Sequence, residues 1–205
     1  MKDCKLYVII DREIIKNRDI RRVTKDALRG GADIIQLRDK SSPDGNFLQY
    51  AKAIKKITKK YKCPFIVNDR VDIAYIVDAD GVHLGGGDIP IEEARKILGS
   101  KIIGVSTHNL KEAKKAVKKG ADYIGIGPVF TSKTKKGPSP IGLSILRRIS
   151  KTIDIPFFAI GGISLTNIAK VKKAGADRIA VISSVLKSKN VYDSVRKLKE
   201  AISQT

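Results

Sequence analysis

Cationic and amide side chains gather at the end of one short apolar run in this sequence. Alternation along a strand places Gln36, Arg38 and Lys40 on the same side of the run 34–40. Because Arg offers a planar fork of donors and Lys a point charge, the three side chains together suit a multiply charged anion. The alternative is that these cations form only an exposed salt bridge with Asp39.

Two carboxylates follow the next apolar runs. Asp69 closes one run, and Asp88 comes after three consecutive glycines at 85–87. Two carboxylates beside an anion-binding cluster repel one another unless a cation joins them, and Mg²⁺ binds one or two carboxylates together with phosphate oxygens and water. Asp69 taken alone is also a good cap for a following helix. The pair predicts a Mg²⁺ site.

Hydroxyl groups and glycines mark a second anion site. The segment 130–140 combines hydroxyls, three lysines and a glycine, which predicts a loop that grips phosphate. Backbone amides at Gly161-Gly162 and Ser183-Ser184, after the last two apolar runs, predict a phosphate site of their own. Ser106 stands near His108, but no acidic side chain stands beside that histidine to orient it. We therefore expect Ser106 to donate a hydrogen bond to substrate rather than to act as a nucleophile.

The elements that must position these residues alternate along the whole chain. Near-continuous apolar runs predict strands buried on both faces, and the amphipathic stretches between them predict helices. Four Gly-Ala-Asp or Ala-Asp-Gly marks, about two strand–helix units apart, stand before every second strand and are interpreted as helix ends, not as chemistry. Eight strand–helix units predict a single (β/α)8 TIM barrel over residues 1–205. We expect strands at 5–10, 34–37, 65–68, 81–84, 101–105, 123–127, 157–160 and 178–182, and helices at 19–29, 46–61, 72–77, 91–98, 110–119, 143–150, 165–174 and 192–202.

Composition limits the classes of function. The chain has 205 residues with 41 Lys+Arg against 21 Asp+Glu, a formal net charge of +20, which raises the question of nucleic-acid binding. The lysines, however, occupy the polar faces of helices, and with 5% aromatic residues and no Trp there is little to stack on bases. No apolar run approaches the roughly 18 residues of a membrane span. Two cysteines predict a reducing, cytoplasmic setting, and the sequence leaves a homo-oligomer open.

An ordered set of motifs resembles the thiamine-phosphate synthase (thiamine-phosphate pyrophosphorylase) family over nearly the whole chain. Each motif alone is weak, but their order is specific. The motifs are Gln36-Leu37-Arg38-Asp39-Lys40, Val67-Asn68-Asp69-Arg70, Asp80-Gly81-Val82-His83-Leu84-Gly85 with Asp88, Gly104-Val105-Ser106-Thr107-His108, Gly125-Ile126-Gly127-Pro128-Val129-Phe130, Ser132-Lys133-Thr134-Lys135-Lys136 and Ala159-Ile160-Gly161-Gly162-Ile163.

The resemblance implies a transferase that joins hydroxymethylpyrimidine diphosphate to hydroxyethylthiazole phosphate, giving thiamine phosphate and pyrophosphate. It implies Mg²⁺ at Asp69 and Asp88, and Gly86-Gly87 stands where the family usually has Gln-Glu. Positions matching the pyrimidine diphosphate site are Gln36, Arg38, Lys40, Asn68, Ser106 and Lys135, with Arg38, Lys40, Ser106 and Lys135 as the catalytic group. Positions matching the thiazole phosphate site are Ser132, Thr134, Gly162, Ile182 and Ser183.

Two other functions compete with this hypothesis. One is an isomerase similar to the thiazole tautomerases, which share the barrel and lack the metal site. The presence of both aspartates together with the cations at 38, 40 and 135 argues against it. The other is a non-catalytic regulator or nucleic-acid-binding protein, which is supported only by the net charge of +20.

Overall fold

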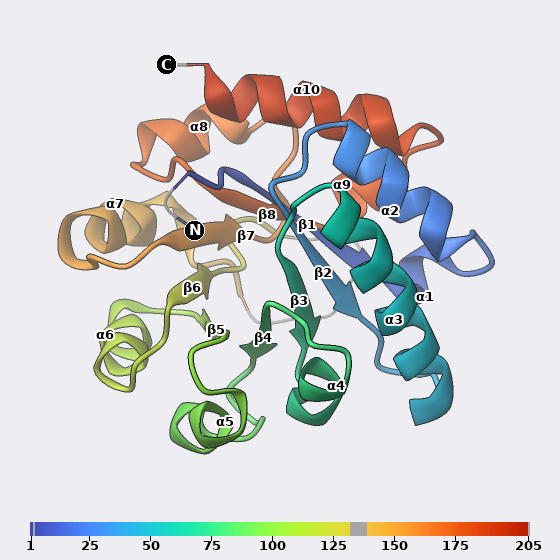
Figure 1. Cartoon of the computed structure of the whole chain (residues 1–205). Coiled ribbons are helices and arrows are strands. Elements are labelled where there is room, and N and C mark those ends of the chain that lie inside the picture. The colour runs from blue at the N-terminus through green and yellow to red at the C-terminus, as the bar shows by residue number, and fades with distance from the viewer. Residues whose placement is uncertain (2, 132–138, 205) are drawn as a thin grey trace.

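Eight parallel strands close into a barrel in sequence order in the computed structural model, which describes residues 1, 3–131 and 139–204. Hydrogen bonding of the first strand to both the second and the last closes the ring. The TIM barrel predicted from the sequence is therefore confirmed (Figure 1). The strands are β1 (Leu6–Asp11), β2 (Ile34–Arg38), β3 (Phe65–Asn68), β4 (Gly81–Leu84), β5 (Ile102–Thr107), β6 (Tyr123–Ile126), β7 (Phe157–Ile160) and β8 (Ile179–Val181).

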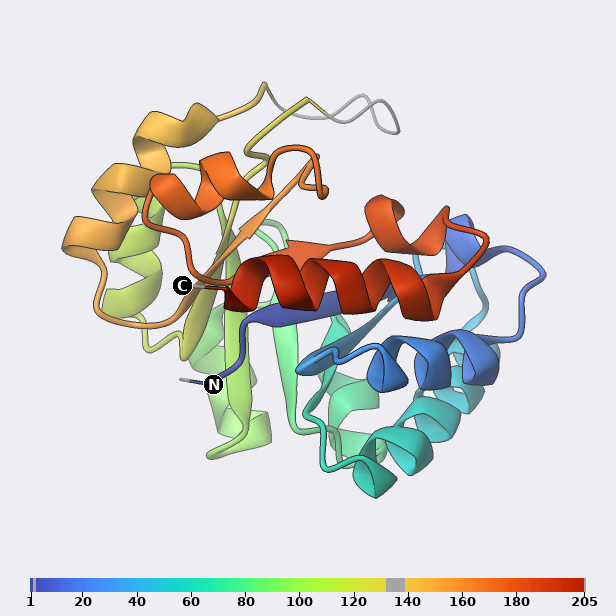
Figure 2. The same cartoon turned by 90° about the horizontal axis from the view of Figure 1, so that it is seen from above.

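Helices surround the strands on the outside of the barrel, as Figures 1 and 2 show. All eight expected helices are present, with bounds that differ from the expected ones by three residues or fewer. Two further helices, α1 and α9, were not predicted because four residues are too few to show a helical period. The helices are α1 (Arg12–Ile15), α2 (Ile20–Arg29), α3 (Asp44–Lys60), α4 (Val71–Ile76), α5 (Ile91–Leu98), α6 (Leu110–Lys118), α7 (Gly142–Thr152), α8 (Ile168–Lys173), α9 (Ser183–Leu186) and α10 (Val191–Ser203).

Alternation along each strand divides the core into two layers. In β1, Leu6, Val8 and Ile10 belong to the large cluster packed between strands and helices, whereas Tyr7 and Ile9 belong to a smaller cluster inside the barrel. Both faces of the strand are buried, which is why the apolar runs in the sequence are nearly continuous. The interior cluster consists of Tyr7, Ile9, Ile34, Ile66, Tyr123, Phe158 and Ala180.

The repeated aspartates lie at the amino ends of the strands. Asp80 accepts a hydrogen bond from the backbone N–H of Phe65 at 2.9 Å, and Asp122 accepts one from that of Ile103 at 2.7 Å. Asp33 does the same at the start of β1. These three residues satisfy backbone donors at the end of the barrel opposite the predicted chemistry, which agrees with their interpretation as architecture; Asp177, the fourth, accepts instead from the side chain of Arg178. Along the described part of the chain, no helix is both long and apolar enough to cross a membrane.

Candidate active site

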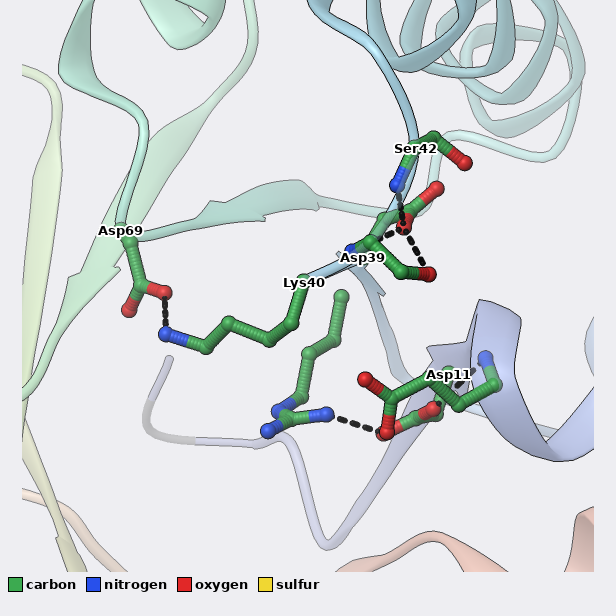
Figure 3. Close-up of polar contacts among 8 residues, drawn as sticks. Asp11, Asp39, Lys40, Ser42 and Asp69 are labelled. Atoms are coloured by element: carbon green, nitrogen blue, oxygen red, sulfur yellow. Dashed lines mark hydrogen bonds and ion pairs between the residues drawn. The ribbon is translucent and has the colours of Figure 1, made fainter.

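Three of the predicted site residues meet where neighbouring strands end. Lys40, Asp69 and Asp88 follow β2, β3 and β4, and the carboxyl ends of parallel strands lie together at one mouth of a barrel. Figure 3 shows the Lys40 side chain extended toward Asp69, with which it forms an ion pair. The carboxyl groups of Asp69 and Asp88 lie close enough for each to shift the pKa of the other. Asp88 also accepts a hydrogen bond from the backbone N–H of Gly85 at 2.6 Å.

The backbone of Asp69 is in the left-handed region, with φ of 62°. Only glycine adopts this conformation without cost, although Asp and Asn tolerate it better than other residues. The alternative role, a helix cap, is not what the structure has, because the residue at the N-cap of α4 is Arg70. Strained backbone of this kind concentrates at functional sites. The strain turns the Asp69 carboxyl toward Lys40 and Asp88 at the barrel mouth.

Electrostatics at the aspartate pair are unequal. Burial and the neighbouring Asp88 raise the pKa of Asp69 above its usual range, and Lys40 offsets this only in part. Burial alone would also raise the pKa of Asp88, but hydrogen bonds from Asp69 and the Gly85 amide outweigh it, so the pKa of Asp88 is lowered. Asp69 is therefore the member of the pair that takes up a proton first as the pH falls, as expected for two carboxylates that lie close together.

The chemistry of this donor set fits a magnesium ion. Within the described residues, no group of three or more His, Cys, Asp or Glu side chains is arranged to hold a metal, so the protein offers two carboxylates. Mg²⁺ is bound in this way when phosphate oxygens and water complete its shell, whereas Zn²⁺ prefers three or four nitrogen or sulfur ligands. The ammonium of Lys40 already stands beside Asp69 as a monovalent cation.

Arg38 is held by a residue that sequence reasoning missed. Its Nη1 lies 2.6 Å from Oδ2 of Asp11, whose side chain is buried at the end of β1. The register of the sheet pairs Asp11 directly with Arg38, so adjacency in the barrel, not in the sequence, makes this ion pair. The alternative of an exposed salt bridge to Asp39 is wrong, because that carboxylate instead accepts hydrogen bonds from the backbone of Ser41 and Ser42 (Figure 3).

A cavity of about 420 Å³ lies beside this cluster, over the ends of β5 to β8. Gly162, Ile182 and Ser183, three of the residues predicted to hold a phosphate group, line it together with Ser106. Gly162 has φ of 65°, and an added Cβ would lie 2.9 Å from Cβ of Phe130, so the close approach of backbone here requires glycine. The structure therefore brings the two groups of predicted residues to the same end of the barrel.

One hydroxyl in the cavity wall lacks a hydrogen-bond partner within the part of the chain that the structure describes. Ser184 lines the cavity, and its Oγ is buried without a hydrogen-bond partner among the described residues. A buried polar group without a partner costs about 1–3 kcal/mol, which an anion accepting its proton would relieve. The sequence had singled out the pair Ser183-Ser184 only for its backbone amides.

Gln36 and Ser106 point into the barrel and are held by residues that sequence reasoning did not assign. Gln36 is 1% exposed and donates from Nε2 to the hydroxyl of Tyr7 at 2.7 Å. Ser106 lies 2.9 Å from Nε2 of His83, whose pKa burial lowers to about 4. The signal that could have found these residues is polar or aromatic side chains at inward positions of short strands, namely Tyr7, His83 and Tyr123.

His108 is arranged differently from expectation. The sequence showed no acidic side chain beside it, but Glu112, one turn later on α6, lies 2.9 Å from its Nδ1. That prediction is wrong, because the chain enters α6 directly after His108 and Asn109, and the first turn of the helix places Glu112 beside the imidazole. Ser106 nevertheless bonds to His83, not to His108.

The remaining predicted residues stay as predictions. Asn68 is buried at the end of β3, beside His83 of β4. Ser132, Thr134 and Lys135 lie outside the described residues.

Comparison with known proteins agrees with this geometry. The family model described as thiamine monophosphate synthase matches residues 6–185. The chain belongs to the thiamine monophosphate synthase family. A thiamine-phosphate synthase of Halalkalibacterium halodurans is 47% identical over 93% of this chain and 92% of its own length. One of Chloroflexus aurantiacus is 45% identical over 99% of this chain and 94% of its own.

A solved structure of the family has the same fold. The thiamine phosphate pyrophosphorylase of Pyrococcus furiosus superposes with a TM-score of 0.89 at 43% identity, covering 97% of this chain and 95% of its own. The family resemblance drawn from the ordered motifs is confirmed.

Proposed function

We propose that this chain is a transferase that condenses 4-amino-2-methyl-5-hydroxymethylpyrimidine diphosphate with 4-methyl-5-(2-hydroxyethyl)thiazole phosphate, giving thiamine phosphate and pyrophosphate. Family membership supports the reaction. The observation that carries it is the junction of an acidic pair and two cations with a cavity at one end of the barrel. A diphosphate and a second phosphorylated substrate can meet there.

The cations act on the diphosphate of the pyrimidine substrate. Arg38 keeps its guanidinium in place through the buried carboxylate of Asp11, so the fork is oriented before substrate arrives. Lys40, which forms an ion pair with Asp69, supplies a second cation to the diphosphate. Positive charge positioned in advance stabilises the negative charge that grows on departing pyrophosphate. Lys135 adds a third cation in this proposal.

Magnesium belongs to this proposal through Asp69 and Asp88. When bound at these two carboxylates, Mg²⁺ supplies charge neutralisation for the leaving pyrophosphate. A magnesium ion held by Asp69 and Asp88 would compete with the ion pair between Asp69 and Lys40, and the ammonium of Lys40 would then be available to the diphosphate.

The second substrate is held by its own phosphate. Backbone groups at Gly162, Ile182 and Ser183 line the cavity and place the thiazole beside the pyrimidine, with Ser132 and Thr134 completing the site in this proposal. The electron-rich aminopyrimidine carries the positive charge left when pyrophosphate departs, and the thiazole nitrogen attacks from close range. No protein nucleophile is needed, which agrees with the bonding of Ser106 to His83 and not to a base–acid pair.

A two-substrate assay tests the proposal. Pyrophosphate release should require both substrates and Mg²⁺, and excess chelator should abolish it until Mg²⁺ is restored. Turnover of a thiazole phosphate alone without metal would favour a tautomerase-like isomerase instead. Salt-sensitive binding of duplex or single-stranded nucleic acid without pyrophosphate release would favour the non-catalytic alternative.

A cytoplasmic place of action completes the proposal. Cys4 and Cys63 are both free thiols, and burial raises the pKa of Cys63 to about 12, which keeps it protonated and unreactive. Unpaired cysteines are typical of a reducing compartment.

A further inference from the structure

A continuous row of hydrogen bonds crosses the inside of the barrel. Gln36 donates to the hydroxyl of Tyr7 at 2.7 Å, and that hydroxyl lies 2.9 Å from the hydroxyl of Tyr123. The hydroxyl of Tyr123 lies 2.9 Å from Nδ1 of His83, whose Nε2 lies 2.9 Å from Oγ of Ser106. The five residues come from β2, β1, β6, β4 and β5. The row ends at two residues of the proposed pyrimidine diphosphate site.

The middle of this row is shut off from water. Tyr7 is 1% exposed and Tyr123 is 0% exposed, and the ring of Phe158 packs edge-on against both. The ring of Tyr123 fills the space that Gly104 leaves empty, because an added Cβ there would lie 2.0 Å from its Cζ. The two hydroxyl protons must therefore find acceptors within the row.

The available protons and acceptors allow the hydrogen bonds of the row to run in one direction, from Gln36 toward His83. Gln36 presents an N–H to Tyr7, so the only acceptor left for the Tyr7 proton among the described contacts is the oxygen of Tyr123. The Tyr123 proton must then go to Nδ1 of His83. A histidine protonated on Nδ1, or on both nitrogens, would turn the Tyr123 hydroxyl back toward Tyr7 and leave a buried O–H without an acceptor, at a cost of about 1–3 kcal/mol.

The direction of these hydrogen bonds determines how Ser106 presents its hydroxyl in the active site. With Nδ1 accepting, the single proton of the neutral ring is on Nε2 and is donated to Oγ of Ser106. The oxygen of Ser106 is then occupied as an acceptor, and its own proton is free to point into the cavity that it lines. A diphosphate has acceptors only, so this is the orientation that binds it. It also prevents His83 from acting as a base toward Ser106.

We propose that His83 is a positioning residue, held as its Nε2–H tautomer by Tyr7 and Tyr123, which fixes the hydroxyl of Ser106 as a hydrogen-bond donor to the diphosphate of the substrate. The statement about the substrate rests on the proposed function, whereas the tautomer does not. Tyr7 links Gln36 at one end of the row to Ser106 at the other. Its hydroxyl accepts a hydrogen bond from the Gln36 amide and therefore donates its own proton toward Tyr123.

The tautomer is measured without any substrate. The chain contains two histidines, so ¹⁵N-labelled histidine gives two sets of ring signals, and His108→Gln assigns them. At neutral pH we expect the His83 ring to show a protonated Nε2 and an unprotonated Nδ1. A ring protonated at Nδ1 would mean that the row runs from Ser106 to Gln36, and this result overturns the proposal. Because no turnover is involved, the result stands whatever reaction the chain catalyses.

Kinetics of matched variants test the positioning. Tyr7→Phe deletes one buried hydroxyl and keeps the ring, and we expect kcat to fall about tenfold, the equivalent of one charge-assisted hydrogen bond. The KM for the thiazole phosphate should stay unchanged. Tyr75→Phe is the control, because the Tyr75 side chain is 62% exposed on α4. In the Tyr7→Phe background, Ser106→Ala should cost less than it does in the native chain, since both changes act through one hydroxyl.

A second pair of variants separates positioning from packing. Gln at position 83 can carry an N–H close to where Nε2 stands, whereas Asn is too short to reach Ser106. We expect His83→Gln to retain more activity than His83→Asn at equal thermal stability. Equal activity of the two variants, or wild-type kcat in Tyr7→Phe, would contradict the positioning role. If the native chain shows no activity with both substrates and Mg²⁺, that result contradicts the proposed function. It leaves the tautomer result unchanged.

Discussion

At the scale of single residues, Asp69 is a carboxylate held in a conformation and beside a neighbour that both destabilise it. Its left-handed backbone and its contact with Asp88 both carry a cost. We expect Asp69→Asn to lower kcat by about 100-fold or more, comparable to the loss of one electrostatic group at a reacting centre. The fold should be kept, because Asn tolerates the same backbone and no longer repels Asp88. Steady-state pyrophosphate release, with a thermal melt alongside, measures both.

Asp44→Asn is the matched control for this substitution. Asp44 is an exposed carboxylate at the start of α3, where it forms an ion pair with Arg70, the residue that follows Asp69. Its substitution should leave kcat and KM within about twofold of the native values, since exposed ion pairs contribute little. Full activity in Asp69→Asn would show that the metal assignment is wrong.

Ser184 offers a second prediction about a single group. Its buried Oγ has no partner among the described residues and belongs to the wall of the cavity. If it donates to the thiazole phosphate, Ser184→Ala should raise the KM for that substrate about fivefold to tenfold and leave the KM for the pyrimidine diphosphate unchanged. Without substrate, the variant should be as stable as the native chain or slightly more so, because an unsatisfied group is removed. An unchanged KM for the thiazole phosphate would exclude this contact.

At the scale of elements, β5 and β6 depend on one missing side chain. Gly104 of β5 pairs with Tyr123 of β6, and an added Cβ would lie 2.0 Å from Cζ of the tyrosine ring. Gly104→Ala should therefore lower the free energy of unfolding by about 1–3 kcal/mol or more, as overpacked cores do. Urea denaturation measures it. Gly87→Ala is the control, because no atom of the described residues lies within 4 Å of a Cβ there, and its midpoint should not move.

Strands and long helices were predictable from sequence because burial on both faces and helical periodicity are local signals. The bounds of β3, β4, β7 and α5 were predicted to the residue. The short helices α1 and α9 were not, since each is four residues long and depends on what it packs against. Chain order and the rule that parallel strands end at one mouth were enough to bring Asp69 and Asp88 together.

The partners of the site residues were not predictable in the same way. Asp11 meets Arg38 because β1 and β2 pair in one register, and no spacing in the sequence states that register. Tyr7, Tyr123 and His83 look like ordinary strand residues until the barrel closes and turns them toward one another. The side chains proposed to contact substrate lie in recognisable sequence motifs. The side chains that orient them can be identified only from their contacts in the folded barrel.

At the scale of the whole molecule, the formal net charge of +20 is spread over the outer helices, where many lysines and arginines pair with carboxylates. Such a surface draws small anions toward the barrel without specifying which one enters. Selection is left to the mouth, where the described cations at 38 and 40 are each held by a carboxylate until a substrate arrives.

Stability of the whole molecule should also report on the interior row of hydrogen bonds. Burial lowers the pKa of His83 to about 4 from its usual 6.5, so between these values the unfolded chain binds a proton that the folded chain does not. The contribution of His83 to the free energy of unfolding should be complete above pH 6.5. It should decrease as the pH drops toward 4, by at most about 3 kcal/mol. In His83→Gln the decline over this window should be shallower. Urea denaturation at several pH values measures both slopes, and parallel slopes would mean that the ring is already protonated in the folded barrel.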